Sequence, residues 1–112
     1  MAKQYIPSRN DVVWLTFNPQ SGHKQSGRRP TIVISPLVYN QKSGLALFCP
    51  ITSKIKGYPF EVKLPDSSPI LGVILADQLK SLDWKARNSE YICEVPPETM
   101  NELVNKLKTI IL

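Results

Sequence analysis

The stretch Val12–Phe17, with the sequence VVWLTF, indicates a β-strand. β-branched and aromatic residues are frequent in strands, and a run this dense predicts a strand buried on most of both faces. Short apolar runs recur along the chain, and each is bounded by proline, glycine or polar turn residues. They lie at residues 31–35, 45–49, 60–64, 72–76 and 91–95. We expect residues 39–44 to form a turn, Pro50 to close the third run, and residues 80–84 to continue the fifth strand after a bend.

Residues 60–64 show the alternation expected of a strand with one buried face. Phe60, Val62 and Leu64 are apolar, whereas Glu61 and Lys63 between them are charged. Successive side chains of a strand point to opposite faces. The pattern therefore predicts that the apolar side chains face the core and that Glu61 and Lys63 face solvent.

The C-terminal segment carries the helical pattern. Its apolar residues fall on one helical stripe: Met100, Leu103, Val104, Leu107, Ile110 and Ile111. Pro97 and Glu98 suit the first turn of a helix, and Lys106 and Lys108 suit the last turns, where a cation stabilises the helix dipole. Five or six short strands and one helix predict a mainly β fold, a small partly closed β-barrel with the helix packed against it.

Length and composition favour one soluble domain spanning residues 1–112. The longest apolar stretch, Ile70–Ala76, is far shorter than the roughly 20 residues that cross a bilayer. The N-terminus lacks the anatomy of a signal peptide, so we expect a cytoplasmic protein. In that compartment Cys49 and Cys93 are expected to be thiols rather than a disulfide.

The charge of +5 is unevenly distributed. Residues 1–56 hold eight basic residues and one acidic residue (8 − 1 = +7), and residues 57–112 hold six and eight (6 − 8 = −2). A basic half predicts a polyanionic partner such as nucleic acid, because clustered cations release counterions when phosphates bind. A merely soluble basic surface is the alternative.

Most enzyme signatures are absent from the sequence. His23 is the only histidine and lies in the long polar segment 18–28, which we expect to be a mobile loop. No zinc-ligand spacing, phosphate-binding glycine loop or nucleophile elbow is present, and Asp77 has no obvious carboxylate partner. Catalysis would then depend on Arg, Lys, Thr, Ser, Tyr or backbone groups, without a metal or cofactor. Such groups suit stabilisation of a phosphoryl transition state.

Polar clusters stand at the ends of the predicted strands. They are Lys24–Pro30, Ile51–Lys56, Asp77–Ser81 and Lys85–Arg87. Arg29, next to Pro30, would be fixed at the rigid start of a strand, whereas Asp77 and Gln78 could equally form a structural hydrogen-bonding pair. The residues alone predict a small basic barrel that binds single-stranded nucleic acid.

The ordered motifs of the chain resemble those of the MazF/PemK family of toxins. The matching segments are Asp11–Trp14, Phe17–Pro19, Gly22–Pro30, Val33–Pro36, Pro50–Ser53, Lys56–Val62 and Leu75–Ser81. The resemblance runs from about Tyr5 to the C-terminal helix. It implies an SH3-like barrel with a C-terminal helix, a homodimer, and a sequence-selective endoribonuclease of a type II toxin–antitoxin system, inhibited by an acidic MazE-like antitoxin.

The resemblance also implies a mechanism and its residues. Members of the family cut single-stranded mRNA without a metal, using the 2′-hydroxyl of the RNA as nucleophile and leaving a 2′,3′-cyclic phosphate and a 5′-hydroxyl. The catalytic arginine and threonine of the family match Arg29 and Thr52. We expect Arg29 to stabilise the phosphorane, since a guanidinium that stays protonated is a poor general base.

The remaining polar residues of the matched segments are expected to bind RNA. They are Lys24, Arg28, Lys56, Asp77, Gln78, Lys80 and Arg87. Segment 18–28 is expected to change its order with substrate or antitoxin. Two alternatives share this fold: a non-catalytic poison of DNA gyrase, disfavoured because the Arg/Thr pair is present, and an RNA-binding module without activity.

Overall fold

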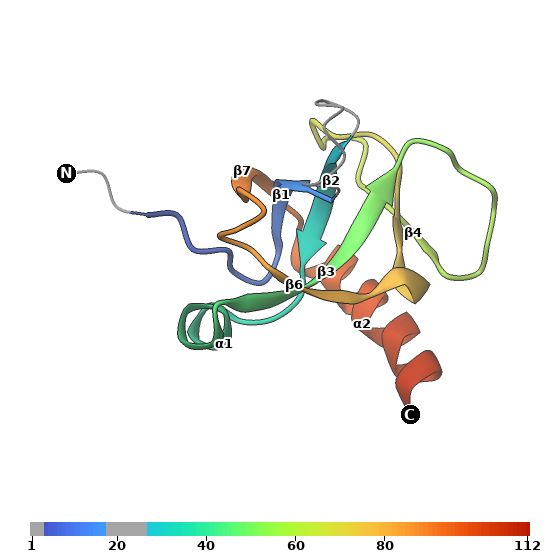
Figure 1. Cartoon of the computed structure of the whole chain (residues 1–112). Helices are drawn as coiled ribbons and strands as arrows, with labels where there is room; N and C mark the ends of the chain where they lie inside the picture. Colours follow the sequence, from blue (N-terminus) through green and yellow to red (C-terminus); the bar gives the residue numbers. More distant parts are fainter. Residues whose placement is uncertain (1–3, 18–26) are drawn as a thin grey trace.

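The structure is a computed structural model that describes residues 4–17 and 27–112. Seven strands, two α-helices and a 3-10 helix (η2) make up the described part of the chain (Figure 1). In chain order they are β1 (Asp11–Thr16), β2 (Arg28–Val33), α1 (Leu37–Ser43), β3 (Leu45–Thr52), β4 (Glu61–Lys63), β5 (Val73–Leu75), η2 (Ala76–Gln78), β6 (Lys80–Asp83), β7 (Glu90–Glu94) and α2 (Pro97–Ile111).

The strands form one antiparallel sheet in the order β4-β5-β3-β2-β1-β7, with β6 also paired to β3. Strand β3 is central: β2 lies along one of its edges, and β6 and β5 follow one another along the other. Among the described residues the end strands β4 and β7 do not pair, so the sheet stays open. The predicted mainly β fold with a C-terminal helix is confirmed, and the term SH3-like barrel describes its open sheet only loosely.

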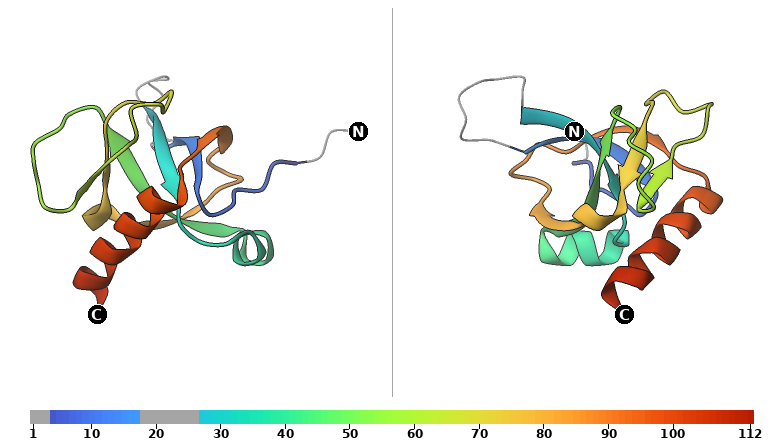
Figure 2. Two further views of the ribbon diagram at one scale, coloured as in Figure 1. Left: turned by 180° about the vertical axis from the view of Figure 1, so that it is seen from behind. Right: turned by 90° about the vertical axis from the view of Figure 1, so that its right-hand side faces the viewer.

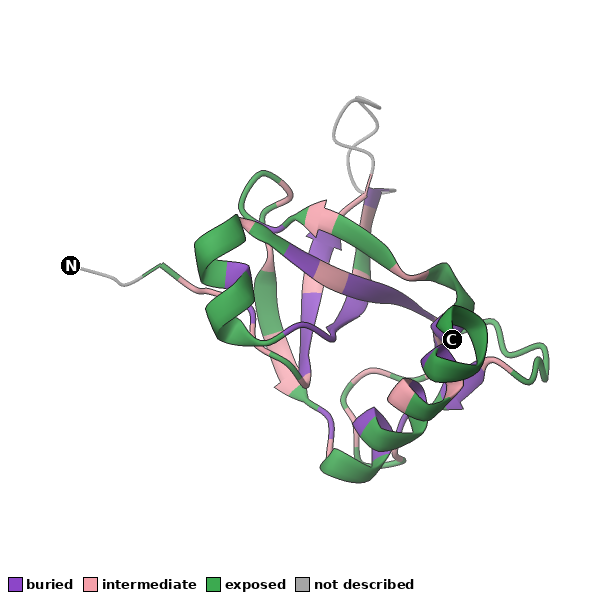
Figure 3. Cartoon of the chain, turned by 90° about the horizontal axis from the view of Figure 1, so that it is seen from below, coloured by how far each residue is buried: buried purple, intermediate pink, exposed green. Residues whose placement is uncertain are grey.

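Each face of the sheet buries its own apolar cluster. One cluster, which includes Ile32, Ile51 and Ile74, packs against Met100, Leu103 and Leu107 of α2. The other contains Leu15, Val33, Phe48 and Trp84. Figure 2 shows α2 lying across the sheet, and Figure 3 shows the buried residues concentrated in the strands between the two helices. Only one face of the sheet is therefore covered by α2.

Helix α2 forms as the apolar stripe predicts. Pro97 lies in its first turn, where the missing N–H costs no hydrogen bond. Met100, Leu103 and Leu107 are buried, and burial of side chains of this size stabilises a fold by about 2 kcal/mol each. The stripe extends beyond the sheet, because Ile110 and Ile111 at its end are exposed.

The predicted turn at 39–44 is wrong: residues 37–43 form α1. Gly44 ends this helix with φ of 75°, and its N–H donates to the carbonyl of Asn40. Asn40 itself is fully buried and donates to the carbonyl oxygens of Pro7 and Ser35. Seven residues with no apolar stripe facing the sheet give little helical periodicity, which is why the pattern failed here.

The prediction that Pro50 closes the third strand is also wrong. Strand β3 continues through Pro50 to Thr52, with Pro50 opposite Thr31 of β2. On the other edge of β3, η2 crosses between β5 and β6, so no strand there needs the N–H that proline lacks. Residues 80–83 form a separate strand, β6, which pairs with β3.

Both cysteines are free thiols, as expected, with Cys49 buried and Cys93 half-buried. Within residues 4–17 and 27–112, no helix has the length and apolar character to span a membrane.

Candidate active site

The register between β2 and β3 brings Arg29 and Thr52 together. Thr31 pairs with Pro50, so continuing the antiparallel register by two residues sets Arg29 opposite Thr52. Side chains alternate along a strand, and Val33 and Phe48 on the same face belong to the cluster that α2 does not cover. Arg29 and Thr52 therefore lie at one end of the sheet face that is free of α2.

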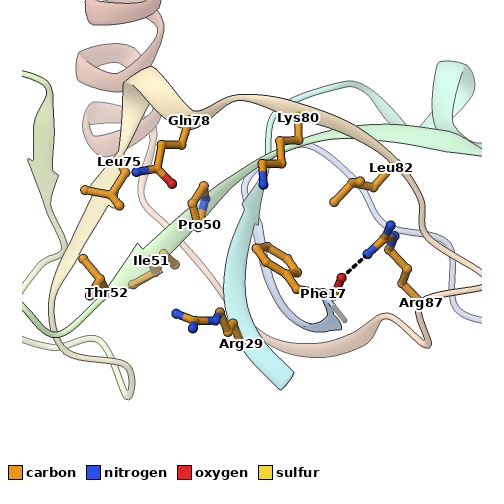
Figure 4. A pocket seen from close by; sticks show the side chains of 10 residues that line it. All are labelled: Phe17, Arg29, Pro50, Ile51, Thr52, Leu75, Gln78, Lys80, Leu82 and Arg87. Atoms are coloured by element: carbon orange, nitrogen blue, oxygen red, sulfur yellow. Dashed lines mark hydrogen bonds between the residues drawn. The ribbon is translucent and has the colours of Figure 1, made fainter. Parts of the chain in front are cut away.

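A cavity of about 480 Å³ opens on this face (Figure 4). Three strands contribute to it through side chains that share the face: Arg29 from β2, Thr52 from β3 and Lys80 from β6. The other lining residues are Phe17, Pro50, Ile51, Leu75, Gln78, Leu82 and Arg87. All four polar clusters that the sequence places at strand ends thus contribute residues to one cavity.

Two further hollows share lining residues with this cavity. One, of about 420 Å³, is lined by Arg29 and Thr52 together with Lys54 and Leu71. The other, of about 210 Å³, is lined by Thr52, Lys54, Lys56, Tyr58, Glu61, Leu75, Asp77 and Gln78. Because Thr52 lines all three, we refer to them together as the groove, with Thr52 at its centre.

The hydroxyl of Thr52 is oriented by the chain that follows it. The backbone N–H of Lys54 donates to Thr52 Oγ1 at 3.1 Å. A hydroxyl has one donor and two acceptor positions, so this contact uses an acceptor position and leaves the O–H proton to donate. Thr52 can therefore give a hydrogen bond to an anion in the groove.

Arg29 presents an uncompensated cation. Its side chain is exposed, and Figure 4 shows its guanidinium extending from β2 toward Thr52. No ion pair between described residues involves it. A guanidinium in this position can donate two parallel hydrogen bonds to the oxygens of one phosphate.

Arg28, the neighbouring base, is engaged elsewhere. It donates to Glu90 Oε1 at 2.8 Å and to Thr16 Oγ1 at 3.0 Å, and it does not line the groove. Of the predicted RNA-binding residues, the structure brings together Lys56, Asp77, Gln78, Lys80 and Arg87 with Arg29 and Thr52. Lys24 and residues 18–26 of the loop expected at 18–28 lie outside the described residues, and Arg28 already belongs to β2.

Arg87 supports one end of the groove. Its Nη1 donates to the carbonyl oxygens of Thr16 at 3.1 Å and Phe17 at 2.8 Å (Figure 4). The ammonium of Lys80 lies 5.6 Å from the centre of the Phe17 ring, within cation–π range. Phe17 thus contacts two cationic side chains, Lys80 through its ring and Arg87 through its carbonyl oxygen.

The other end of the groove repeats this pairing of cation and aromatic ring, since Lys56 Nζ lies 5.8 Å from the centre of the Tyr58 ring. The sequence interpretation missed Phe17 and Tyr58 as lining residues, although each is an aromatic residue beside a predicted polar cluster. It was wrong about Glu61, which is buried rather than facing solvent.

The groove is cationic as a whole. Arg29, Lys54, Lys56, Lys80 and Arg87 line it, against the carboxylates of Glu61 and Asp77. Aromatic rings beside cations suit a single-stranded nucleic acid, whose bases stack while its phosphates bind the cations. In the described part of the chain, no group of three His, Cys, Asp or Glu side chains could hold a metal ion.

Comparison with known proteins gives a full-length match. The family model described as PemK-like, MazF-like toxin of type II toxin–antitoxin system matches residues 8–111. The endoribonuclease toxin MazF of Escherichia coli K12 is 41% identical over 111 residues, which cover 99% of each chain.

Solved structures agree with the sequence match. MazF from Deinococcus radiodurans superposes with a TM-score of 0.88 at 47% identity, covering 96% of this chain and 98% of that one. A chain from the crystal structure of the MazE–MazF complex of the same organism gives a TM-score of 0.87 at 42% identity, with coverages of 96% and 97%.

Proposed function

The chain belongs to the family of PemK-like, MazF-like toxins of type II toxin–antitoxin systems, and on that basis we propose that it cleaves single-stranded mRNA with Arg29 and Thr52 as its catalytic residues. It is an endoribonuclease toxin of the MazF kind. The observation that supports this site most directly is that Arg29 and Thr52 together line two hollows of a cationic groove.

The proposed reaction is a transphosphorylation within the RNA. The 2′-oxygen loses its proton and bonds to the adjacent phosphorus, the bond to the 5′-oxygen breaks, and that oxygen takes up a proton. The products are a 2′,3′-cyclic phosphate and a 5′-hydroxyl. Arg29 donates two hydrogen bonds to the non-bridging oxygens, and Thr52 donates a third through its O–H. These contacts strengthen as negative charge develops on the phosphorane, and no metal takes part.

The groove residues divide by the part of the RNA that each can bind. Lys56, Lys80 and Arg87 would bind phosphates, as would Lys24. Gln78 and Asp77 would read base edges, because amide and carboxylate groups match the donors and acceptors of bases. A lysine variant should weaken binding of all RNAs alike and lower its salt dependence, whereas Gln78→Ala should change the preferred cleavage sequence.

The proposed partners rest on the family resemblance and, for the antitoxin, also on the charge of the groove. We propose that residues 1–112 act as a single toxin domain in the cytoplasm, as a homodimer, and that an acidic MazE-like antitoxin occupies the groove. The MazE–MazF complex from D. radiodurans supports an antitoxin partner. Carboxylates of an acidic chain can bind the same cations that bind RNA phosphates.

The test is to sequence the 5′ ends of RNA incubated with purified protein in EDTA. We expect cuts at a defined sequence with 5′-hydroxyl ends. Arg29→Ala and Thr52→Val should each lower kcat by about 10²- to 10³-fold, the usual effect of removing one donor to a developing oxyanion. Loss of wild-type cutting in EDTA, or full activity in Arg29→Ala, would refute the mechanism. Salt-dependent RNA binding without fragments would favour the non-catalytic module instead.

A further inference from the structure

Residues 53–59, which make up all but the last residue of the connection from β3 to β4, form one wall of the groove. This segment is exposed along its whole length and extends as a wide loop beside the sheet (Figure 1). Lys54, Lys56 and Tyr58 from this loop line the groove. An exposed loop has few packing contacts of its own, so its hydrogen bonds must supply most of its order.

Two of those hydrogen bonds end on one buried carboxylate. The backbone N–H of Lys56 donates to Oε2 of Glu61, and that of Gly57 donates to Oε1, both at 3.0 Å. Gly57 has a φ of 83°, a conformation that favours glycine. Consecutive N–H groups that converge on one anion form a stable anion-binding arrangement, and here the anion is a side chain of the same protein.

Glu61 is itself held from two sides. Its backbone N–H donates to the carbonyl of Tyr58 at 3.1 Å, and its carbonyl accepts a hydrogen bond from Lys106 Nζ of α2 at 2.9 Å. Lys106 is also 3.6 Å from Glu102 on the same helix. The backbone of Glu61 is thus anchored to the sheet through its pairing with Leu75 of β5 and to α2 through Lys106.

The loop leads directly back to the catalytic pair. Lys54, two residues before Lys56, is the residue whose N–H orients the Thr52 hydroxyl. Within the described chain, the remaining hydrogen bond of residues 53–59 is the one between Glu61 and Tyr58. If the Glu61 carboxylate were lost, the loop would keep only the hydrogen bonds near its two ends, at Lys54 and Tyr58.

We propose that Glu61 is a positioning residue of the endoribonuclease site, whose carboxylate binds the Lys56 and Gly57 amides and thereby orients the Thr52 hydroxyl and the Lys56 side chain. The inference rests on the proposed function of the groove. Both oxygens of the Glu61 carboxylate accept loop amides, so its effect on the site passes through the loop.

Two variants separate this role from a general contribution to stability. Glu61→Gln keeps the size of the side chain but turns an N–H group toward one of the two amides, and Glu61→Ala removes both acceptors. Asp11→Asn is the matched control. Asp11 is a buried carboxylate that accepts hydrogen bonds from Tyr5 and from the Ser8 amide, and it does not line the groove.

The measurements are kcat and KM per folded molecule, with the folded fraction taken from circular dichroism, and amide hydrogen exchange at Lys56 and Gly57. We expect kcat to fall about 10-fold in Glu61→Gln and about 100-fold in Glu61→Ala, as small misplacements of catalytic groups do. Exchange at the two amides should accelerate. Asp11→Asn should keep the wild-type kcat and the wild-type exchange at both amides.

A single-stranded DNA probe, which has no 2′-hydroxyl, separates failure of this inference from failure of the proposed function. Wild-type protein that leaves RNA uncut refutes the proposed function. The positioning role is then judged by DNA affinity, which should fall several-fold in Glu61→Ala and stay unchanged in Asp11→Asn. If Glu61→Ala fails to fold, Glu61→Gln decides. Wild-type kcat and wild-type DNA affinity in the Glu61 variants would overturn the inference, even with faster amide exchange.

Discussion

Gly72 lies directly against the peptide of Thr52. A Cβ atom on Gly72 would stand 2.1 Å from the Thr52 carbonyl oxygen and 2.8 Å from its carbonyl carbon, closer than real Cβ contacts. The backbone of Gly72 also has φ of 128°, which side chains rarely adopt. The end of β3 that carries Thr52 thus packs against a position that only glycine fits.

Gly72→Ala is expected to destabilise the protein and to displace Thr52. Strained backbone of this kind costs about 1–3 kcal/mol, and the clash with a carbonyl adds to it. The free energy of unfolding in urea and kcat per folded molecule measure the two effects. Gly44→Ala is the control, because Gly44 also has positive φ but has open space around it. An equal cost in both variants, with kcat unchanged, would contradict the prediction.

Arg87→Met is expected to weaken RNA binding through Phe17. The substitution removes the donor from the Thr16 and Phe17 carbonyls, which costs about 2 kcal/mol of stability and releases the ring that lines the groove. Phe17→Leu should then lower RNA affinity to a similar extent. The salt dependence of binding separates this effect from the phosphate contact proposed above for Arg87, because loss of that contact would lower the slope by about 1.

Lys85→Met is the control for this experiment, because Lys85 is an exposed base in the same turn that does not line the groove. It should leave both the stability and the RNA affinity close to wild type.

Asn40→Leu is expected to lower the free energy of unfolding by about 3 kcal/mol, because it leaves buried oxygens without donors. Asn40 Nδ2 donates to the carbonyls of Pro7 and Ser35, and its Oδ1 accepts from the Ser35 hydroxyl. Urea unfolding measures the loss. Gln41→Leu, at the exposed neighbouring position of α1, should change stability little. Equal unfolding free energies for the two variants would show that the buried hydrogen bonds of Asn40 contribute little to stability.

Alkaline pH is expected to destabilise the protein through Cys49. Burial, with a smaller effect of the Asp77 charge, raises the pKa of its thiol from 9.0 to about 12. Above pH 9 the unfolded chain loses this proton while the folded chain keeps it, so the unfolded state is favoured as pH rises from 9 to 12. The unfolding free energy measured across this range should fall less steeply in Cys49→Ala. If the unfolding free energy fell equally steeply with pH in wild type and in Cys49→Ala, the loss of stability could not come from Cys49.

Most of the strands and α2 could be predicted because each carries its own local signal, whereas β6 was expected to be a continuation of the fifth strand. Val12–Phe17 and the stripe from Met100 to Leu107 are long enough for the pattern to decide the element. α1 could not be predicted, because its seven residues are held by contacts of Asn40 with chain segments that are distant in sequence. The same applies to Pro50, whose missing N–H is tolerated only because η2 crosses beside it.

For the site, Arg29 and Thr52 came from an ordered motif series, and the residues alone predicted no more than a cationic nucleic-acid surface. The buried position of Glu61 contradicts its strand alternation, because the amides that bind its carboxylate come from the preceding loop. Arg28 and Arg29 are neighbours of the same type in the sequence, yet Arg28 pairs with Glu90 and only Arg29 faces the groove.

The sequence by itself determined that the chain is mainly β with a C-terminal helix, that its N-terminal half is basic, and to which family it belongs. These properties depend on residue type and on short-range order, which are present before the chain folds. The tertiary structure alone decided which cations share the groove, how the Thr52 hydroxyl is oriented and why residue 72 is glycine. Those relationships arise from strand register and from close backbone contacts between segments far apart in the chain.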